Sequence, residues 1–401
     1  MKDDVFHEAV ILSAVRTPVG KYGGKLSTVR PDDLAALVIA EAVRRAGLEP
    51  ALVDDVIIGC SNQAGEDNRN VARMAVLLAG FPHTVPGVTV NRLCGSGLEA
   101  INMAARSIMT GEAKIVVAGG VESMTRAPLV TLKPEKGFPR GGMKLVDTTI
   151  GWRFVNPRWP ASYPTYEMGE TAENLAEKYR ISREKQDEFA LMSHRRAIEA
   201  TDSGRFRDEI VPVKVDSESV NEDEGPRRNT SFEKLSSLQP VFRKGGTVTA
   251  GNSSQISDGA SALVLSSREV ADSLGLKPVA KYVASSNVGV DPSYMGIGPV
   301  PATRKILERT GLDMSDFGVV ELNEAFAAQV LACFIEMPEL EKSRLNPNGG
   351  AIALGHPIGC SGARIATTLI HEMSRSHSKY GLATMCIGVG QGISTAFEVE
   401  K

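Results

Sequence analysis

The chain has 401 residues, with 45 Lys and Arg against 48 Asp and Glu, so its formal net charge is −3 at pH 7. This balance excludes the broad basic surface on which sequence-independent nucleic-acid binding depends, and a hydrophobic content of 42% excludes a disordered chain. At about 150 residues per domain, the length predicts two or three structural units. The longest apolar runs, such as 113–121, fall far short of the ~20 residues that a membrane-spanning helix needs, so we expect no membrane partner.

The five cysteines are Cys60, Cys94, Cys333, Cys360 and Cys386. None forms a Cys-x-x-Cys pair, so the sequence predicts neither a zinc site nor a thioredoxin-like motif. An odd number of thiols fits a reducing compartment. The first seven residues resemble neither a signal peptide nor an Arg-rich transit peptide, and the last five carry no peroxisomal address. We therefore expect a cytoplasmic protein.

The chain repeats itself, beginning with a helical pattern that ends at Gly47 and an apolar run at 53–58. The same order returns 264 residues later, at Gly311 and the run 317–321. Both glycines are expected to follow helix ends with positive φ. Both apolar runs are expected to be buried strands.

The repeat continues with a glycine-rich helix start. A Cys-Gly-Ser-Gly segment at 94–97 opens a helix to about 110, and a strand follows at 113–120. A Gly-Cys-Ser-Gly segment at 359–362 opens a second helix, and a strand follows at 382–388. The offset drifts only from 265 to 269, so the sequence predicts a duplicated α/β unit.

The middle of the chain, 122–248, does not fit the repeat. It holds both tryptophans, a charged run at 222–224, and two amphipathic helical patterns near 171–178 and 182–200. We interpret it as a large insertion in the first half. Long excursions of this kind usually serve a functional site.

Cys94 is the first candidate catalytic residue. It follows a strand at 86–91 and precedes a helix start, where the helix dipole and free N–H groups are expected to lower its pKa from about 8.5. A buried cysteine that merely packs is the alternative. A competing motif, Gly95–Ala100, matches the G-x-G-x-x-A fingerprint of dinucleotide-binding enzymes. Its acidic partner would be Glu122, which lies 25 residues after Gly97, so the fit is loose.

His356 lies between Gly355 and Pro357 in a segment with five glycines between 349 and 362. A histidine held on such a loop is a candidate base for a thiol near neutral pH, and a structural role is the alternative.

Cys386 and Asn323 complete the set of candidates. Cys386 ends a strand before three glycines in five residues, whose N–H groups could hold an oxyanion, although a buried strand-end cysteine would explain it equally well. Asn323 follows the strand at 317–322, where a helix N-cap is the simpler interpretation. Two thiols, one imidazole and one amide at strand ends suit carbon–carbon bond chemistry beside a thioester.

These residues resemble the thiolases (acetyl-CoA acyltransferases). The resemblance covers essentially the whole chain and rests on ordered motifs at 13–18, 90–97, 119–124, 249–254, 323–326, 355–362 and 386–392.

The resemblance implies two βαβαβαββ halves in a five-layered αβαβα sandwich with an inserted loop domain. The expected boundaries are 1–121 with 249–275 for the N-terminal half, 122–248 for the loop domain, and 276–401 for the C-terminal half.

The resemblance also implies residue roles. Cys94 would be acylated, His356 would activate it, and Cys386 would be the second acid/base. Asn323 would hold a water that forms one oxyanion hole with His356. The backbone N–H groups of Cys94 and Gly388 would form the other.

Further positions match the coenzyme A and acyl contacts of the family. Coenzyme A would bind as a substrate, with no tightly bound cofactor and no metal. The matching contact positions are Arg227, Ala250 and Ser254 for coenzyme A, and Met168 and Phe326 for the acyl end.

One position departs from the short-chain biosynthetic thiolases. Many of these have His before the Met-Gly of the loop domain, whereas this chain has Glu167. The segment 147–157 resembles degradative thiolases, including those that cleave 3-oxoadipyl-CoA. We therefore expect a degradative 3-oxoacyl-CoA thiolase, as in fatty acid β-oxidation, that forms homodimers or homotetramers. An acetoacetyl-CoA thiolase and a 3-oxoadipyl-CoA thiolase are the alternatives within the family. A nicotinamide-dependent dehydrogenase and a non-catalytic CoA- or lipid-binding protein are the alternatives from other classes.

Overall fold

The computed structural model describes residues 6–138 and 140–400. The strands within these residues are β1 (Ala9–Arg16), β2 (Gly20–Lys21), β3 (Asp55–Gly59), β4 (Val88–Val90), β5 (Ile115–Ser123), β6 (Leu129–Val130), β7 (Val146–Asp147), β8 (Val213–Val215), β9 (Glu218–Val220), β10 (Ser257–Ser267), β11 (Ala280–Gly289), β12 (Phe317–Leu322), β13 (Tyr380–Ile387) and β14 (Gln391–Val399).

The α-helices of the same residues are α1 (Pro31–Arg45), α2 (Val71–Leu78), α3 (Ser96–Met109), α4 (Met168–Lys178), α5 (Arg183–Asp202), α6 (Phe232–Ser236), α7 (Arg268–Ser273), α8 (Pro299–Thr310), α9 (Ala327–Glu336), α10 (Ala351–Leu354) and α11 (Ile358–Ser376). Short 3₁₀ turns lie at Pro50–Leu52 (η1), Pro292–Ile297 (η2) and Met314–Asp316 (η3). No helix in this part of the chain is both long and apolar enough to cross a bilayer.

The large sheet confirms the predicted duplication. Its order is β12-β13-β14-β11-β1-β10-β5-β3-β4. Counted outwards from the β11–β1 junction, each half-sheet has two antiparallel pairings and then a parallel one. The strands β1, β10, β5 and β3 of the first half therefore correspond, in that order, to β11, β14, β13 and β12 of the second. The two half-sheets join through only two residue pairs, Val10–Lys281 and Ile11–Ala280.

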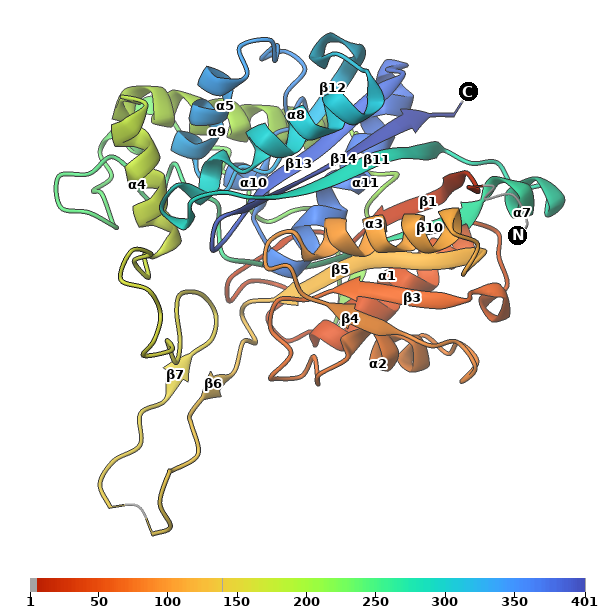
Figure 1. Ribbon diagram of the computed structural model, residues 1–401, viewed down its shortest axis with the longest axis horizontal. Helices are drawn as coiled ribbons and strands as arrows, with labels where there is room; N and C mark the ends of the chain where they lie inside the picture. The colour runs from red at the N-terminus through yellow and green to blue at the C-terminus, as the bar shows by residue number, and fades with distance from the viewer. Residues whose placement is uncertain (1–5, 139, 401) are drawn as a thin grey trace.

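Helices cover both faces of each half-sheet and give the five αβαβα layers (Figure 1). α1 and α2 pack on the outer face of the first half-sheet, and α8 and α9 pack on the outer face of the second. α3 and α11 lie between the half-sheets, in a core that draws side chains such as Ile101, Ile365, Leu263 and Met385 from both halves. A helix in this middle layer must be apolar or small on all sides, which explains the composition of α11.

Glycines allow the two central helices to approach closely. A Cβ at Gly97 would lie 2.7 Å from the Ala363 nitrogen and 2.9 Å from the Gly359 oxygen, and one at Gly362 would lie 2.3 Å from the Leu98 nitrogen. Each of these distances is below normal contact, so the first turns of α3 and α11 touch through their backbones. The predicted helix ends also hold, since φ is 71° at Gly47 and 70° at Gly311.

The chain between β5 and β10 leaves the first half-sheet and covers the second. Its helix α4 packs on α9, and α5 packs on α9 and α10. A buried cluster of one arginine and two carboxylates anchors the segment between β5 and β10. Arg16 of β1 contacts Glu209 at 2.6 Å and Asp223 at 2.7 Å, and all three side chains have almost no exposure. The expected domain boundaries remain a prediction. Residues 1–5 and 401, which belong to the terminal segments considered for targeting signals, lie outside the described residues.

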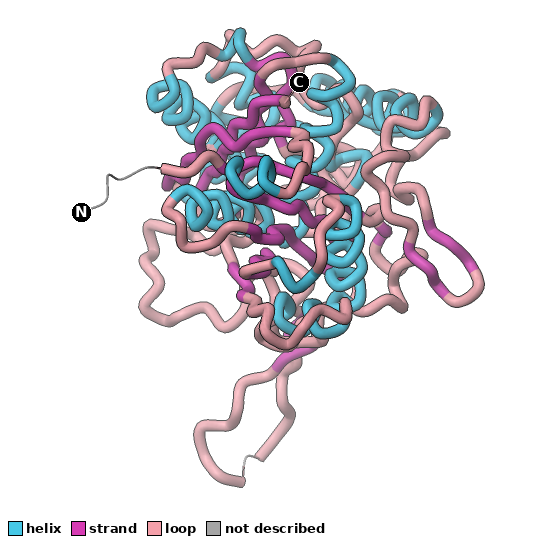
Figure 2. The backbone as a smooth tube through the Cα atoms, turned by 90° about the vertical axis from the view of Figure 1, so that its right-hand side faces the viewer, coloured by secondary structure: helices cyan, strands magenta, loops and turns pink. Residues whose placement is uncertain are grey.

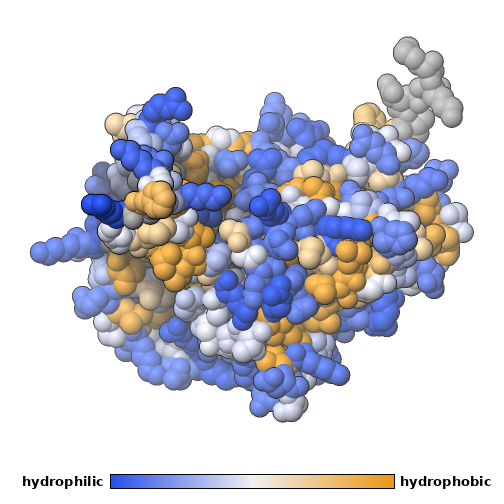
Figure 3. Space-filling view, turned by 90° about the horizontal axis from the view of Figure 1, so that it is seen from below, coloured by the Kyte–Doolittle hydropathy of each residue, from blue (hydrophilic) through white to orange (hydrophobic). Residues whose placement is uncertain are grey.

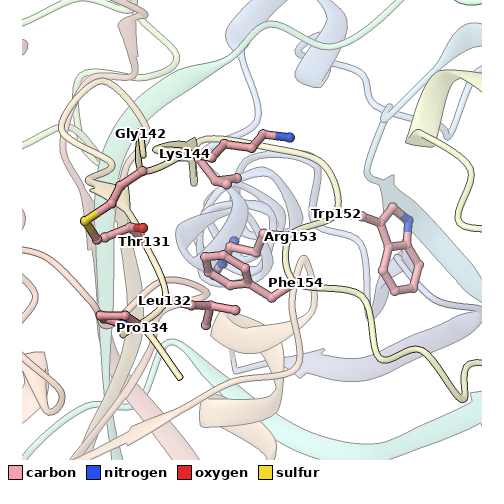
Figure 4. Close-up of a pocket in the computed structure, with 10 residues that line it drawn as sticks. Thr131, Leu132, Pro134, Gly142, Lys144, Trp152, Arg153 and Phe154 are labelled. Atoms are coloured by element: carbon pink, nitrogen blue, oxygen red, sulfur yellow. The ribbon is translucent and has the colours of Figure 1, made fainter. Parts of the chain in front are cut away.

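A β6–β7 arm projects from the body (Figures 1 and 2). Apolar side chains on it are strongly exposed, including Leu132 at 62% and Phe138 at 100%. A shallow pocket on the arm is lined by Leu132, Trp152 and Phe154, among others (Figure 4). Exposed apolar surface of this kind is typical of regions that contact other molecules.

We predict that Gly97→Ala destabilises the protein by about 1–3 kcal/mol, because the added methyl group overpacks the contact between α3 and α11. The measurement is the midpoint of urea unfolding. Gly289→Ala is the matched control, since a Cβ there meets nothing within 4 Å and φ is not positive. Equal midpoints for the two variants would contradict the role assigned to this contact.

Candidate active site

The segments that precede α3 and α11 meet at one end of the central layer. Cys94 and His356 each lie two residues before the first residue of their helix. Because the first turns of the two helices touch at Gly97 and Gly359, these two segments are brought together. The positive ends of both helix dipoles also face this point, which favours negative charge there.

Cys94 lies in a tight turn. Ser96 holds the turn, since its Oγ accepts the Arg92 N–H at 2.8 Å and donates to the Leu93 oxygen at 2.6 Å. Leu93 has a φ of 47°, an uncommon value for a residue with a side chain. Of the five cysteines, Cys94 is half-buried and the other four are buried. The turn therefore presents a thiol that a substrate could reach.

The pKa of Cys94 is raised, contrary to the sequence prediction. Burial of the sulfur raises the pKa, N–H groups of Gly388 and Cys94 lower it in part, and the negative charge of Glu122 raises it further. The predicted helix effect was wrong in its net sign because desolvation of a thiolate outweighs it. The thiol is therefore protonated at rest, and a base must take its proton.

Cys386 lies next to Cys94. It is the penultimate residue of β13 and is only 2% exposed. Burial raises the pKa of its thiol well above the usual range, and negative charge on Cys94 raises it further. A second thiol that holds its proton this firmly can act as an acid towards a strong base such as a carbanion.

His356 is on the three-residue loop between α10 and α11, as predicted. Its backbone N–H donates to the Gln255 oxygen at 3.0 Å. Its Nδ1 lies 2.5 Å from Ser361 Oγ, and that hydroxyl lies 2.9 Å from the Pro357 oxygen. We assign the hydroxyl proton to Pro357, so that Nδ1–H donates to Ser361 and Nε2 keeps its lone pair. Burial, with Arg364 nearby, lowers the pKa of His356 to about 4, so the imidazole is neutral near pH 7.

Asn323 directs its amide towards His356. The Asn323 Nδ2 lies 3.5 Å from His356 Nε2, and its backbone N–H donates to the Thr384 oxygen at 3.0 Å. The N-cap interpretation is wrong, because α9 begins four residues later with Phe326 at its N-cap position. The Asn323 Oδ1 is buried without a partner among residues 6–138 and 140–400. The structure therefore places the Asn323 amide beside the imidazole and not at the start of a helix.

Gly388 faces the two thiols from the turn between β13 and β14. Its N–H lies close enough to the Cys94 sulfur to lower the pKa of that thiol. The space beside its Cα is bounded by Met168 Sδ and Leu93 Cδ1, which would lie 3.4 and 3.5 Å from a Cβ at this position. Val389 and Gly390 turn the chain with φ of 62° and 78°. The N–H at Gly388 is therefore placed to stabilise negative charge on an atom bound to Cys94.

Two of the predicted acyl and coenzyme A contacts lie beside the thiols. Met168 and Phe326 share one apolar cluster with Cys386. Ser254 donates its N–H to the Ala325 oxygen at 2.9 Å and directly precedes Gln255, which holds His356.

The remaining two of the five predicted contacts, Arg227 and Ala250, lie at the surface, where both are exposed. The Arg227 N–H donates to His194 Nδ1 at 3.1 Å, and Gln255 Nε2 donates to the nearby Gly225 oxygen at 3.1 Å. This chain of contacts connects the Arg227 segment to the His356 loop, although no contact places the Arg227 side chain at the thiols.

Glu122 is a residue whose role was missed from the sequence. Its carboxylate accepts hydrogen bonds from the Ser61 N–H at 2.9 Å, the Ser61 hydroxyl at 2.6 Å and the Gly359 N–H at 2.8 Å. Burial raises its pKa to about 7. It therefore fixes the start of α11 to β5, and it is not available to bind a ribose. With Gly97 committed to helix packing as well, the structure does not supply a dinucleotide site at Gly95–Ala100.

Cys60, Asp67 and Glu122 have ligand atoms within 4.8 Å of one another, so they could in principle hold a metal ion. However, the Cys60 sulfur lies 3.8 Å from Asp67 and 3.7 Å from Glu122, at hydrogen-bond length, and the Glu122 oxygens already accept N–H and O–H donors. We assign no metal to this group.

Comparison with known proteins gives consistent matches along the chain. A family model for the thiolase N-terminal domain matches residues 9–269, and one for the thiolase C-terminal domain matches residues 276–399. The chain is 53% identical to the 3-oxoadipyl-CoA/3-oxo-5,6-dehydrosuberyl-CoA thiolase of Escherichia coli K12, over 98% of this chain and 99% of that protein. It is also 53% identical to the beta-ketoadipyl-CoA thiolase of Pseudomonas aeruginosa, with the same coverage. The human mitochondrial 3-ketoacyl-CoA thiolase in complex with CoA superposes with a TM-score of 0.92 at 40% identity, over 99% of each chain.

Proposed function

Since the chain belongs to the thiolase family, we propose that it cleaves 3-oxoadipyl-CoA, or a closely related dicarboxylic 3-oxoacyl-CoA, with CoA. The products would be acetyl-CoA and an acyl-CoA shorter by two carbons. The observation that carries the choice of substrate is the 53% identity, over nearly the full length, to two thiolases named for this substrate. This narrows the general 3-ketoacyl-CoA assignment expected from the sequence and moves it away from fatty acid β-oxidation.

The first half-reaction makes the acyl-enzyme. His356 Nε2 takes the proton of the Cys94 thiol, and the thiolate attacks the 3-oxo carbon. The bond between C2 and C3 breaks, and its electron pair leaves on the acetyl-CoA enolate, which takes the proton of Cys386. This leaves an acyl thioester on Cys94 and a thiolate on Cys386.

The second half-reaction restores the enzyme. The Cys386 thiolate takes the proton of CoA, and the CoA sulfur attacks the thioester carbon. Cys94 leaves as a thiolate and recovers its proton from His356. Thiols and one imidazole account for every proton transfer, so CoA acts as a substrate and the proposed chemistry needs no tightly bound cofactor.

Negative charge develops twice during this sequence, and the site supports both positions. We assign the oxyanion on the carbon attacked by Cys94 to the Gly388 and Cys94 N–H groups. We assign the enolate oxygen to His356 and Asn323. Removal of a single such donor typically costs about 10²–10³ in kcat.

The proposed substrate is tested by comparing kcat/KM for three compounds: 3-oxoadipyl-CoA, a medium-chain 3-oxoacyl-CoA and acetoacetyl-CoA. We expect 3-oxoadipyl-CoA to be favoured at least about tenfold, since recognition of a charged group discriminates more strongly than one methylene does. Equal values, or preference for the medium-chain substrate, would instead support the broader 3-ketoacyl-CoA assignment.

The proposed role of Cys386 predicts a selective defect. Cys386→Ser should lower turnover sharply and suppress exchange of the acetyl-CoA methyl protons with deuterated water, because a serine hydroxyl is a much weaker acid than a thiol. NMR measures the exchange. Cys333→Ser is the matched control, since Cys333 is also buried but lies in α9, where its sulfur contacts the Gly296 oxygen at 3.4 Å. Exchange at the wild-type rate in Cys386→Ser would refute the role.

We also propose that the protein is at least a dimer, because apolar side chains are exposed at one edge of its large sheet. Leu77, Leu78 and Val88 are 39–53% exposed on α2 and β4, and β4 pairs only with β3 among the described residues. Apolar patches are visible on the face seen in Figure 3. Light scattering at micromolar concentration should give at least twice the mass of one chain, and a stable monomer would contradict the proposal.

A further inference from the structure

A buried ion pair lies behind His356. Arg364, on α11, and Glu321, on β12, are each only 1% exposed, and Arg364 Nη1 lies 3.6 Å from Glu321 Oε2. Arg364 lies three residues after Ser361, and Glu321 lies two residues before Asn323. The pair therefore links the two elements that hold the imidazole: Ser361 contacts Nδ1, and Asn323 contacts Nε2.

Stability does not explain this pair. All three guanidinium nitrogens of Arg364, and Oε1 of Glu321, have no hydrogen-bond partner in the part of the chain that the structure describes. A buried charge with incomplete hydrogen bonding costs free energy, and well-packed apolar residues in its place are often neutral or stabilising. A feature that costs stability at the edge of an active site is typical of a functional constraint.

We propose that Arg364 is a positioning residue for His356: with Glu321 it holds α11 and β12 at the spacing that keeps Ser361 and Asn323 on the two imidazole nitrogens. Its positive charge also opposes protonation of the ring. This inference rests on the proposed role of His356 as the base for Cys94.

The charge of Arg364 is not cancelled by Glu321. Burial raises the pKa of Glu321 to about 8, so this carboxyl is protonated most of the time at neutral pH. The Arg364 charge lowers the pKa of His356, next in importance to burial. The pKa of Glu324 is raised by burial, and the Arg364 charge is one of the contributions that oppose this rise.

Few other ionisable groups surround the imidazole. On the β12 side, Glu324 follows Asn323 in the chain, and its carboxylate is held by the Ser193 hydroxyl at 2.6 Å and the Asn346 amide at 2.9 Å. Across the site the imidazole faces the thiols of Cys94 and Cys386, both with raised pKa. Arg364 is thus the cation that the surrounding elements bring to His356.

The test compares Arg364→Met with Arg364→Lys in the full-length protein. In Arg364→Met the pKa of His356 should rise only part of the way from about 4 towards its usual value of about 6.5, because burial, the larger cause of the shift, remains. We expect the acid limb of kcat/KM, the pH range in which activity falls as the imidazole gains a proton, to lie at higher pH in this variant than in the wild type. KM for CoA should stay within about twofold, because Arg364 touches no substrate. Arg364→Lys keeps the charge and should restore most of the wild-type pH profile.

A double variant guards against misfolding. If Arg364→Met does not yield folded protein, Arg364→Met with Glu321→Leu removes both charges and should fold, and the same shift of the acid limb is expected. The inference would be overturned if the folded variant, single or double, had the same kcat as the wild type and the same dependence of kcat/KM on pH at low pH. His356→Ala distinguishes failure of the proposed function from failure of this inference. If His356→Ala is active, His356 is not the base. If His356→Ala is inactive and Arg364→Met behaves like the wild type, only the positioning role of Arg364 is refuted.

Discussion

The contact between the first turns of α3 and α11 is the constraint on which the rest of the structure depends. Each helix comes from one copy of the duplicated unit, and each is enclosed between two half-sheets. Gly97 and Gly362 let the backbones touch, and Glu122 fixes the Gly359 N–H at the same crossing. Because the catalytic candidates precede these two helices, the packing that builds the core also assembles the site.

The site is neutral at rest and becomes charged only during reaction. Burial keeps the two thiols protonated and the imidazole unprotonated, since each charged form would lose hydration. Charge then appears where two helix N-termini and the Gly388 N–H are already oriented. Fixed dipoles in a dry site stabilise such charge without reorganisation, and this is usually the largest contribution to catalysis. The raised pKa of Cys94 is therefore compatible with its proposed role, provided that His356 removes the proton.

Sequence reasoning recovered what is encoded locally or by repetition. The nearly constant offset between halves predicted the matching strand orders, and glycine spacing predicted the helix ends at Gly47 and Gly311. It failed where distant segments decide the outcome. The sign of the Cys94 pKa shift depends on what encloses the sulfur, and the role of Asn323 depends on where α9 starts. The Arg364–Glu321 pair joins two elements through burial alone, and no spacing in the sequence marks it.

The central claim is that Cys94 carries the acyl group, and mass spectrometry of the trapped intermediate tests it most directly. The enzyme is mixed with a 3-oxoacyl-CoA in the absence of CoA, quenched in acid and digested. The peptide that contains Cys94 should gain the mass of the shortened acyl group, and Cys94→Ser should show no such gain on any cysteine. An acyl group on Cys60, Cys360 or Cys386 in the wild-type protein would contradict the account.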